Sequence, residues 1–488
     1  MLWIALYLPE LSLQIAQRGG AVEYPLVISE GPQNRPLVFA ANQPARDLGV
    51  RPAMPLASAR ALAGELQARA READKESEAL HNVACWASQF TPSVSLQSNQ
   101  GLLLEVSATL TLHRGLGSLL GMLRHGLQEL GYLASAGVAP TPLAAWMFAR
   151  ARHHGYAIRT CTRLAELEER LGDLPLPLFG WPADLLQTLS TLGIVRIADC
   201  LKLPRDGFTK RFGEPALLDL DRARDKAPDP RPYFTLPERF SSAVDFGFEV
   251  HDALALLFPL KRLLLEMEGF LRGRGAGVQQ WHLLMQHSRE QTRLTLGVAA
   301  PERDAGRLIA LARERLAQIK LPASVIGMRV EAERFYPFEQ KSASWLPDPR
   351  EQSSGWGHLI DKLASRLGEE KIYRLESRDD HRPERAWRRL PAGVKSKAAK
   401  AAAVPLPSQP RPLLLLPVPR TLLVDGEYPL CQGRLELLAG PERIESGWWD
   451  GRPASRDYYV ARNPHGETLW IYREHRHTDA WYLHGFFA

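Results

Sequence analysis

Short apolar runs and longer amphipathic stretches alternate along the first third of the chain. The runs WIALYL, PLVI, PLVFAA and GLLLEVSA predict strands, whereas PLASARALAGELQARARE and GSLLGMLRHGLQEL carry apolar residues at helical spacing. Strands interleaved with amphipathic helices favour a mixed sheet with helices on one or both faces. Residues 1–165 are therefore predicted to form an α/β or α+β domain.

The pattern becomes helical after this domain and then mixed again. Residues 166–232 predict helices punctuated by Gly and Pro, with Gly180 and Gly193 at two short turns, which is typical of a helix-hairpin-helix pair. After a Pro-rich hinge, residues 240–337 predict the order α-β-β-α-β, with SSAVDFGFEV as a leading strand. This order favours a small four-stranded α+β sandwich.

The last third of the chain contains a low-complexity segment. Residues 391–411 are rich in Ala, Pro and Lys and are predicted to be a solvated linker. They separate residues 338–390 from the aromatic, β-like runs of residues 412–488, which predict a small β-rich module. With 488 residues, the chain is predicted to be a multidomain α+β protein.

Composition and charge narrow the classes of function only a little. The net charge of +6 permits an anionic partner without requiring one. The four cysteines, Cys85, Cys161, Cys200 and Cys431, form no CxxC pair, which disfavours a disulfide framework and a structural zinc site. The first residues lack a signal sequence or a membrane span, so we expect a soluble cytoplasmic protein.

Histidines near the end of the chain are the remaining candidates for a metal site. His475, His477 and His484 lie among aromatic residues, and no fourth ligand has zinc-like spacing. We expect them to be core or interface residues, and we predict neither a metal nor a cofactor. The sequence contains no P-loop and no GxGxxG motif.

Several segments resemble, in order, the Y-family (DinB/UmuC-like) translesion DNA polymerases. QPARDLGVRPAMPLASARAL resembles their finger segment, SNQGLLLEVSA their palm hairpin and GVAPTPLAAWMFAR the following helix. The resemblance implies a palm and fingers at residues 1–165, a helix-hairpin-helix thumb at 166–232 and a little finger at 240–337. DDHRPERAW, GPERIESGWWDGRPASRDYYVA and LHGFFA resemble a Y-family-like subgroup that belongs to a bacterial mutagenesis cassette.

The positions at which active family members hold two metal ions carry no carboxylate. Aligning the motifs places Leu6 at the first aspartate and Gln100 and Gly101 at the Asp-Glu pair. Two-metal nucleotidyl transfer needs hard carboxylate oxygens around Mg²⁺. The resemblance therefore implies a homologue without catalysis.

The residues that bind the triphosphate in the family are also mostly replaced. Gln43 stands at the finger tyrosine, and Pro142 and Trp146 stand at the two lysines. Only Arg46 of that set remains. Two alternatives stay open: an active polymerase whose displaced metal site uses Glu10 or Glu105, and a protein scaffold that does not touch DNA.

The helix-hairpin-helix and little-finger regions contain candidate phosphate contacts. Main-chain N–H groups at a tight turn bind backbone phosphate without reading the sequence, so binding should weaken steeply with salt. Glu266 and Glu268 leave open that some of the cations pair locally. The candidates are Gly180, Gly193, Lys202, Arg205, Lys210 and Arg211 in the first region and Lys261, Arg262, Arg272, Arg274, Arg289 and Arg293 in the second.

The segment QKSASWL follows the predicted little finger, where family members carry a peptide for the β sliding clamp. Gln340, Trp345 and Leu346 would enter the apolar groove of the clamp. Lys341 and Ala343 depart from the usual pattern, so a loop that packs Trp345 locally is the alternative.

Residues 338–390 and 412–488 are candidates for contacts with proteins. GHLIDKLASRLG predicts a short amphipathic helix, and DDHRPERAW either recognises a partner or folds back on the core. The resemblance implies that the partners are primer-template DNA, the clamp, a RecA-like protein and an error-prone DnaE-type polymerase, and that the protein associates with the nucleoid. About half of the aromatic residues should lie in the core, and the candidate anchors are Trp448, Trp449, Tyr458, Tyr459, Trp470, Trp481 and Phe486.

Overall fold

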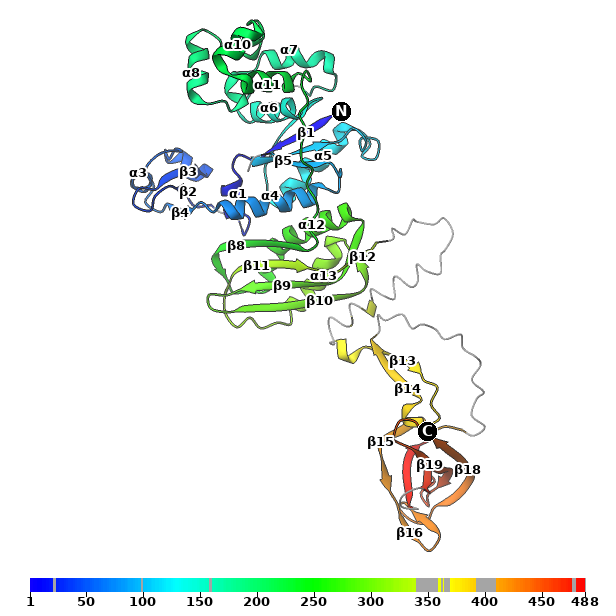
Figure 1. The fold of residues 1–488 in the computed structure, drawn as a ribbon. Coiled ribbons are helices and arrows are strands. Elements are labelled where there is room, and N and C mark those ends of the chain that lie inside the picture. Colours follow the sequence, from blue (N-terminus) through cyan, green and yellow to red (C-terminus); the bar gives the residue numbers. More distant parts are fainter. Residues whose placement is uncertain are drawn as a thin grey trace. The chain divides into compact units, whose positions relative to one another are not determined.

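The computed structural model describes residues 1–20, 23–97, 100–157, 160–338, 359–360, 363, 369–391, 410–475 and 480–487. The chain forms two compact units, Met1–Arg366 and Leu367–Ala488 (Figure 1). Helices and sheets are mixed in the first unit, and strands dominate the second, which confirms the predicted α+β multidomain class with a β-rich C-terminal module. Over the described ranges, no helix has the length and apolar character that crossing a membrane requires.

The palm-like region is a four-stranded sheet with strand β1 inside it. Its order is β5 (Val94–Gln97), β6 (Gly101–Glu105), β1 (Trp3–Tyr7) and β7 (Ser135–Ala139). Every residue of β1 is buried, because helices cover both faces of the sheet. Helices α4 (Ala73–Ala87) and α5 (Leu116–Leu130) share a core with one face, and α6 (Pro142–His153) shares a core with the other.

The finger-like region has a small core of its own. It contains a three-stranded sheet and two short helices: β3 (Leu37–Ala41), β2 (Leu26–Glu30), β4 (Gln67–Ala70), α2 (Gln43–Asp47) and α3 (Leu56–Leu62). The buried Asn42 caps α2, because its Oδ1 accepts hydrogen bonds from the backbone N–H groups of Ala45 and Leu26. Helix α1 (Leu11–Gln17) leads from the palm-like sheet into this region.

The thumb-like region consists of short helices that pack against α6. They are α7 (Leu167–Gly172), α8 (Ala183–Thr191), α9 (Ile197–Leu201), α10 (Arg205–Phe212) and α11 (Glu214–Ala223). Gly180 and Gly193 both have φ = 76°, a left-handed conformation that favours glycine, at the turns before and after α8. The two glycines thus lie at the turns predicted from the sequence.

The little-finger-like region has the predicted order of elements. Strand β8 (Phe240–Val250) precedes α12 (Leu257–Arg274), β9 (Ala276–Gln286), β10 (Gln291–Glu302), α13 (Ala305–Leu316) and β11 (Val325–Ala332). The sheet order is β10-β9-β11-β8, and the short β12 (Phe335–Pro337) adds a further strand beside β9. Helices α12 and α13 share one core with the sheet.

Helix α12 packs closely on the palm-like region at two glycines. A Cβ atom on Gly269 would lie 2.5 Å from the Trp86 ring, and a Cβ atom on Gly273 would lie 3.0 Å from Ser88. Gly126 of α5 contacts the same tryptophan ring from another side. The indole of Trp86 therefore fits between two helices only because both lack a side chain at the contact.

A buried ion pair joins the same two regions. Arg18, which follows α1, donates to Glu266 of α12, and the two side chains are 3% and 0% exposed. Glu266 also accepts a hydrogen bond from Ser242, while Arg18 donates to the Tyr132 hydroxyl at 2.7 Å. Burial lowers the pKa of Arg18, but Glu266 and Tyr132 outweigh it and hold that pKa above its ordinary value. The arginine thus stays charged inside the protein.

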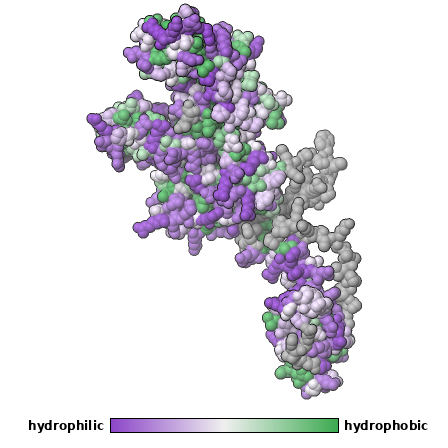
Figure 2. Space-filling view, in the orientation of Figure 1, coloured by the Kyte–Doolittle hydropathy of each residue, from purple (hydrophilic) through white to green (hydrophobic). Residues whose placement is uncertain are grey.

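The C-terminal unit is built on a five-stranded antiparallel sheet. Its strands are β15 (Leu414–Thr421), β21 (Trp481–Phe486), β20 (Thr468–Glu474), β19 (Ala454–Arg462) and β18 (Glu436–Ser446), with the hairpins β13 (Tyr373–Ser377) to β14 (Trp387–Pro391) and β16 (Leu423–Asp425) to β17 (Tyr428–Leu430). Tyr458 and Trp470 stack with ring centroids 4.1 Å apart, and His484 lies 2.9 Å from the Tyr458 hydroxyl. Hydrophobic surface gathers at the end of this unit that carries β16, where Leu423 and Val424 are exposed (Figure 2).

Replacing Glu266 by alanine should destabilise the chain by about 3 to 5 kcal/mol, because Arg18 would remain buried without a counter-ion. Urea unfolding followed by tryptophan fluorescence measures the change in free energy. Glu129→Ala is the matched control, since Glu129 pairs with Lys261 at 3.1 Å but both side chains are partly exposed. That variant should lose about 1 kcal/mol or less, and equal losses for the two variants would contradict a structural role for the buried pair.

Candidate functional site

The centre of the palm-like sheet is where strands β1 and β6 meet. In their antiparallel register Tyr7 lies opposite Gly101, and Leu6 lies opposite Leu102. Successive side chains of a strand point to opposite faces. Leu6 is 2% exposed and packs in the core with α4 and α5, whereas Tyr7 packs on the other face, with α6. The structure thus brings Tyr7 rather than Leu6 together with Gly101.

Gly101 is in close contact with its surroundings on the Tyr7 face. A Cβ atom there would overlap the Leu6 carbonyl oxygen and would lie 2.6 Å from the Trp146 ring. Trp146 is 6% exposed and meets Tyr7 edge to face, with centroids 5.2 Å apart. The indole of Trp146 therefore fills the space that a side chain at position 101 would need.

The residues at this centre do not fit a pair of Mg²⁺ ions. Tyr7, Gln100 and Gly101 offer no carboxylate, and Mg²⁺ in nucleotidyl transfer is held by hard anionic oxygens. Gln100 is exposed, and its backbone carbonyl accepts a hydrogen bond from Leu8 at 2.7 Å. Within the ranges that the structure describes, no three His, Cys, Asp or Glu side chains are grouped so as to hold a metal ion.

The two nearby carboxylates are not brought together. Glu10 forms an ion pair with Arg46, which the sequence resemblance predicts to be the one remaining triphosphate-binding residue. Glu105 lies opposite Trp3, and its Oε1 accepts a hydrogen bond from the Ser107 N–H at 3.1 Å. That pair lies four residue steps from Tyr7 and Gly101, which at about 3.4 Å per residue is roughly 14 Å along the strand.

The other replaced positions have local structural roles. Gln43 donates to Asp47 at 2.7 Å within α2. Pro142 begins α6, where its missing N–H costs nothing, and Thr141 caps that helix by accepting from the Ala144 N–H at 3.3 Å. Gln43 and Pro142 thus stabilise the helices in which they lie.

Of the predicted thumb cations, some are engaged in ion pairs. Arg205 donates to Asp221 at 2.9 Å, and this hydrogen bond raises the pKa of Arg205 and lowers that of Asp221. Lys202 lies 3.5 Å from Asp199. Two predicted contacts are exposed and have no ion pair among the residues described: Lys210 and Arg211.

All four cations predicted on α12 have partners within the first unit, and one of these partners, Glu268 of Arg272, lies on α12 itself. Arg262 is half-buried and donates to the Arg18 carbonyl. The other three contacts are Lys261 to Glu129 at 3.1 Å, Arg272 to Glu268, and Arg274 to the Pro237 carbonyl at 2.8 Å. That these four residues bind phosphate remains a prediction, and the partners that they have within the protein do not favour it.

Arg289 and Arg293 lie on the β9–β10 hairpin and are exposed. Arg293 is opposite Leu284, while the neighbouring Leu294 and Leu296 pack in the core beneath α12 and α13. Strand alternation therefore directs Arg293 to the open face of the sheet, away from both helices. As phosphate contacts, Arg289 and Arg293 stay a prediction.

The candidates in the C-terminal half divide into buried, exposed and undescribed residues. Gln340, Trp345, Leu346 and His477 lie outside the described residues. Tyr458, Trp470 and Trp481 are buried, and Tyr459 and Phe486 are half-buried, so these five belong wholly or partly to the core. Trp448 and Trp449 are 71% and 59% exposed.

Comparison with known proteins shows what the chain is similar to. Residues 14–150 match the impB/mucB/samB family (IMS). The chain is 27% identical to Protein ImuB of Caulobacter vibrioides (strain NA1000 / CB15N) over 476 residues, which cover 90% of this chain and 100% of that protein. The chain is an ImuB homologue.

Two further likenesses cover less of this ImuB homologue. It is 28% identical to DNA polymerase IV of Yersinia pestis (strain Pestoides F) over 258 residues, which cover 51% of this chain and 71% of that protein. It is also similar to the crystal structure of DinB from Sulfolobus solfataricus, with 18% identity and a TM-score of 0.39, over 68% of this chain and 98% of that one.

Placing a side chain at Gly101 of this ImuB homologue should destabilise it. We expect Gly101→Ala to cost about 1 to 3 kcal/mol and Gly101→Glu more, because the Leu6 carbonyl and the Trp146 ring already fill the space. Thermal unfolding followed by circular dichroism measures the change. Gly121→Ala is the control, since nothing lies within 4 Å of its added Cβ on α5. An unchanged midpoint for Gly101→Glu would contradict the filled centre.

Proposed function

We propose that this ImuB homologue is a non-catalytic relative of the Y-family polymerases and acts as an adaptor in translesion synthesis and damage-induced mutagenesis. It binds primer-template DNA and the β sliding clamp, and it recruits an error-prone DnaE-type polymerase together with the RecA-like protein ImuA. The family match, the whole-length similarity to ImuB and the filled centre of the palm-like sheet support this proposal.

The packing at Gly101 carries the non-catalytic part of the proposal. Leu6, Tyr7 and Trp146 occupy the two faces of the strands from which active relatives are expected to present their carboxylates. Restoring an acid at position 101 would require moving a buried indole, and the nearest acids, Glu10 and Glu105, have other partners. A body of this shape retains contacts with DNA while the phosphoryl-transfer chemistry is lost.

The adaptor part of the proposal rests on several weak contacts made by one chain. Exposed cations of the thumb-like and little-finger-like regions bind backbone phosphates, and the QKSASWL segment enters the clamp groove. Each additional contact converts the next binding step into an intramolecular one and so raises the effective concentration of the true polymerase at the primer terminus. Placement of another enzyme therefore requires no active site in this chain.

Primer extension tests the non-catalytic assignment. With Mg²⁺ or Mn²⁺, a primed template and all four nucleotides, the purified chain should add no nucleotide, because Leu6, Gln100 and Gly101 supply no carboxylate to a metal ion. The error-prone DnaE-type polymerase, assayed in the same reaction, is the positive control. Template-directed incorporation that Glu105→Ala abolishes would replace this assignment with that of an active polymerase with displaced ligands.

Charge reversal on the open face of the little-finger-like sheet should weaken binding to DNA. We expect Arg289→Glu/Arg293→Glu to lower the affinity for a primer-template and to reduce the slope of log K against log salt by about 2, because two phosphate contacts are lost. Fluorescence anisotropy across a salt series measures both quantities.

Arg313→Glu is the matched control for this series. Arg313 is an exposed arginine of the same region, but it lies on α13, which covers the opposite face of the sheet. The Arg313→Glu variant should change the affinity for the primer-template little. Equal losses at the two faces would contradict a defined DNA surface, and unchanged binding in the Arg289→Glu/Arg293→Glu variant would favour a protein-only scaffold.

A further inference from the structure

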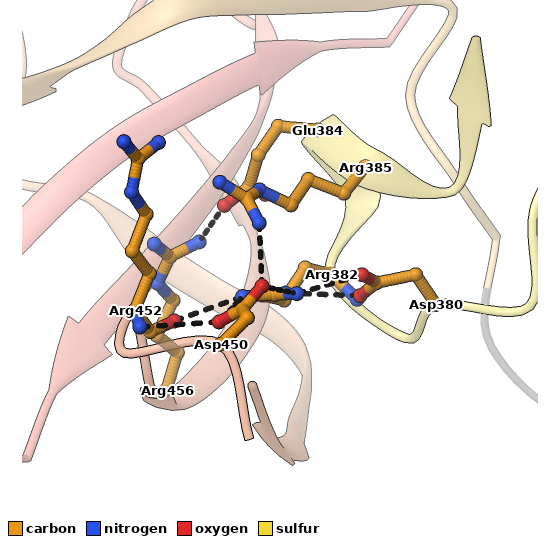
Figure 3. Close-up of polar contacts among 7 residues, drawn as sticks. All are labelled: Asp380, Arg382, Glu384, Arg385, Asp450, Arg452 and Arg456. Carbon is orange, nitrogen blue, oxygen red and sulfur yellow. Dashed lines mark hydrogen bonds and ion pairs between the residues drawn. The ribbon is translucent and has the colours of Figure 1, made fainter. Parts of the chain in front are cut away.

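The sequence motifs DDHRPERAW and GWWDG meet in the C-terminal unit through one buried arginine. Arg382 is 3% exposed and lies between Asp380 and Asp450, 68 residues further along the chain (Figure 3). Its Nη2 lies 2.7 Å from a carboxylate oxygen of each aspartate, and its Nη1 donates to the Arg452 carbonyl at 2.9 Å. Charge-assisted, forked contacts of this kind fix geometry as well as adding energy.

The loop that contains GWWDG takes its shape from this arginine. Gly447 has φ = 82°, and a Cβ atom there would overlap Nη1 of Arg382. Arg385 adds a second contact to Asp450, at 2.6 Å. The contact with Arg382, followed by smaller contributions that include Arg385, holds the pKa of Asp450 at about 2, so the carboxylate stays ionised at neutral pH. The DDHRPERAW segment thus contacts the loop through Arg382 and Arg385.

The tryptophans of this loop are exposed although the residues beside them are fixed. Trp448 and Trp449 are 71% and 59% exposed, and their rings stand at 84° with centroids 4.7 Å apart. The Cζ of Arg382 lies 5.9 Å from the centre of the Trp449 ring. The buried network therefore holds two large apolar rings in water, which is a feature of interaction sites rather than of isolated surfaces.

The charge beside the rings is positive. The carboxylates of Asp380, Glu384 and Asp450 are all engaged by arginines, as the dashed contacts in Figure 3 show. The guanidinium of Arg452 is exposed and points away from this network, with no ion pair among the residues that the structure describes. Arg452 follows Trp449 by three residues in the same loop, so a partner that buries the two tryptophans meets an uncompensated cation on that loop.

The geometry of the rings favours a folded protein over a nucleic acid. Successive nucleobases stack on aromatic faces that lie parallel to them. Two perpendicular rings instead form a knob, and a knob needs a concave apolar pocket to lose contact with water. Trp and Arg are also the side chains that most often dominate protein interfaces.

We propose that Asp380–Arg385 and the loop Gly447–Arg452 form one composite docking surface, in which Trp448 and Trp449 enter an apolar pocket with an acidic rim on a folded protein partner, and in which Arg382 is a positioning residue. The inference rests on the proposed function, since it supplies the surface by which the adaptor holds a protein of the mutagenesis machinery. It adds the chemistry of that partner: an apolar hollow bordered by carboxylates.

The test measures how tightly the full chain binds two purified probes, the error-prone DnaE-type polymerase and ImuA, by surface plasmon resonance. Trp448→Ala/Trp449→Ala and Arg382→Ala should each weaken binding to the same probe about tenfold or more. Arg452→Glu should weaken binding more at low salt than at high salt, because this substitution acts through charge. Arg382→Lys should behave as Arg382→Ala, since an ammonium cannot make the forked contacts.

Two controls separate the surface from general effects. Arg388→Ala removes an arginine of β14 that is 54% exposed and paired with Glu376, and Leu423→Ala removes an exposed apolar side chain on the β16–β17 hairpin. Both should bind as the unmodified chain does. The tryptophan variant should also keep its thermal midpoint, because the rings it loses are largely exposed.

The outcomes distinguish this inference from the proposed function. Failure of the unmodified chain to bind either probe would overturn the adaptor function and the surface with it. Binding that survives in the tryptophan variant would overturn the surface alone, and binding that survives in Arg382→Ala would overturn the positioning role. Loss of affinity for single-stranded oligo(dT), with protein binding retained, would assign the tryptophans to nucleic acid instead.

Discussion

The burial of strand β1 on both faces is the constraint on which the first unit depends. Leu2, Ile4 and Leu6 pack against α4 and α5, and Trp3, Ala5 and Tyr7 pack against α6 and the thumb-like helices beyond it. Helix α4 in turn carries Trp86, which fits against Gly269 of α12. A single five-residue strand thus links the thumb-like core to the little-finger-like region. Any change in its register would move its apolar side chains to the wrong face and disturb both cores together.

This constraint explains how a polymerase-like architecture can persist with Leu6 and Gly101 at the centre of its sheet. The centre of such a sheet has to be either polar, open and metal-bound, or apolar and filled, because a buried carboxylate without a counter-ion is costly. Here Trp146 and Gly101 provide the second solution, with the indole in the space next to the glycine. Replacing carboxylates by apolar contacts removes a source of instability from the strand that the cores share. The proposed loss of catalysis and the retention of the fold are therefore compatible with the same packing.

The sequence predicted the order of elements well and the directions of side chains less well. Alternating and helical spacing identified the strands and helices of the little-finger-like region, and the turn glycines of the thumb-like helices were found by residue type. Motif alignment named Leu6, but strand alternation would have shown that residues 6 and 7 face opposite cores, and only the register revealed Tyr7 opposite Gly101. The cations of α12 were predicted at the DNA surface. Several of their partners, such as Arg18 and Glu129, are too distant in sequence for local patterns to indicate.

Two buried arginines, Arg18 and Arg382, perform related tasks in the two units. Each joins segments far apart in sequence: Arg18 joins the end of α1 to α12, and Arg382 joins the DDHRPERAW segment to the loop of Gly447. A buried ion pair contributes little net stability, because the cost of removing both charges from water offsets their attraction. Its effect is on geometry, since a guanidinium cannot lose its proton and accepts few arrangements of its acceptors. At both places a misplaced segment would leave a charge buried and unpaired. The arginines therefore select one arrangement of the chain over its near alternatives, which matters most in a protein whose proposed work is to hold other molecules in place.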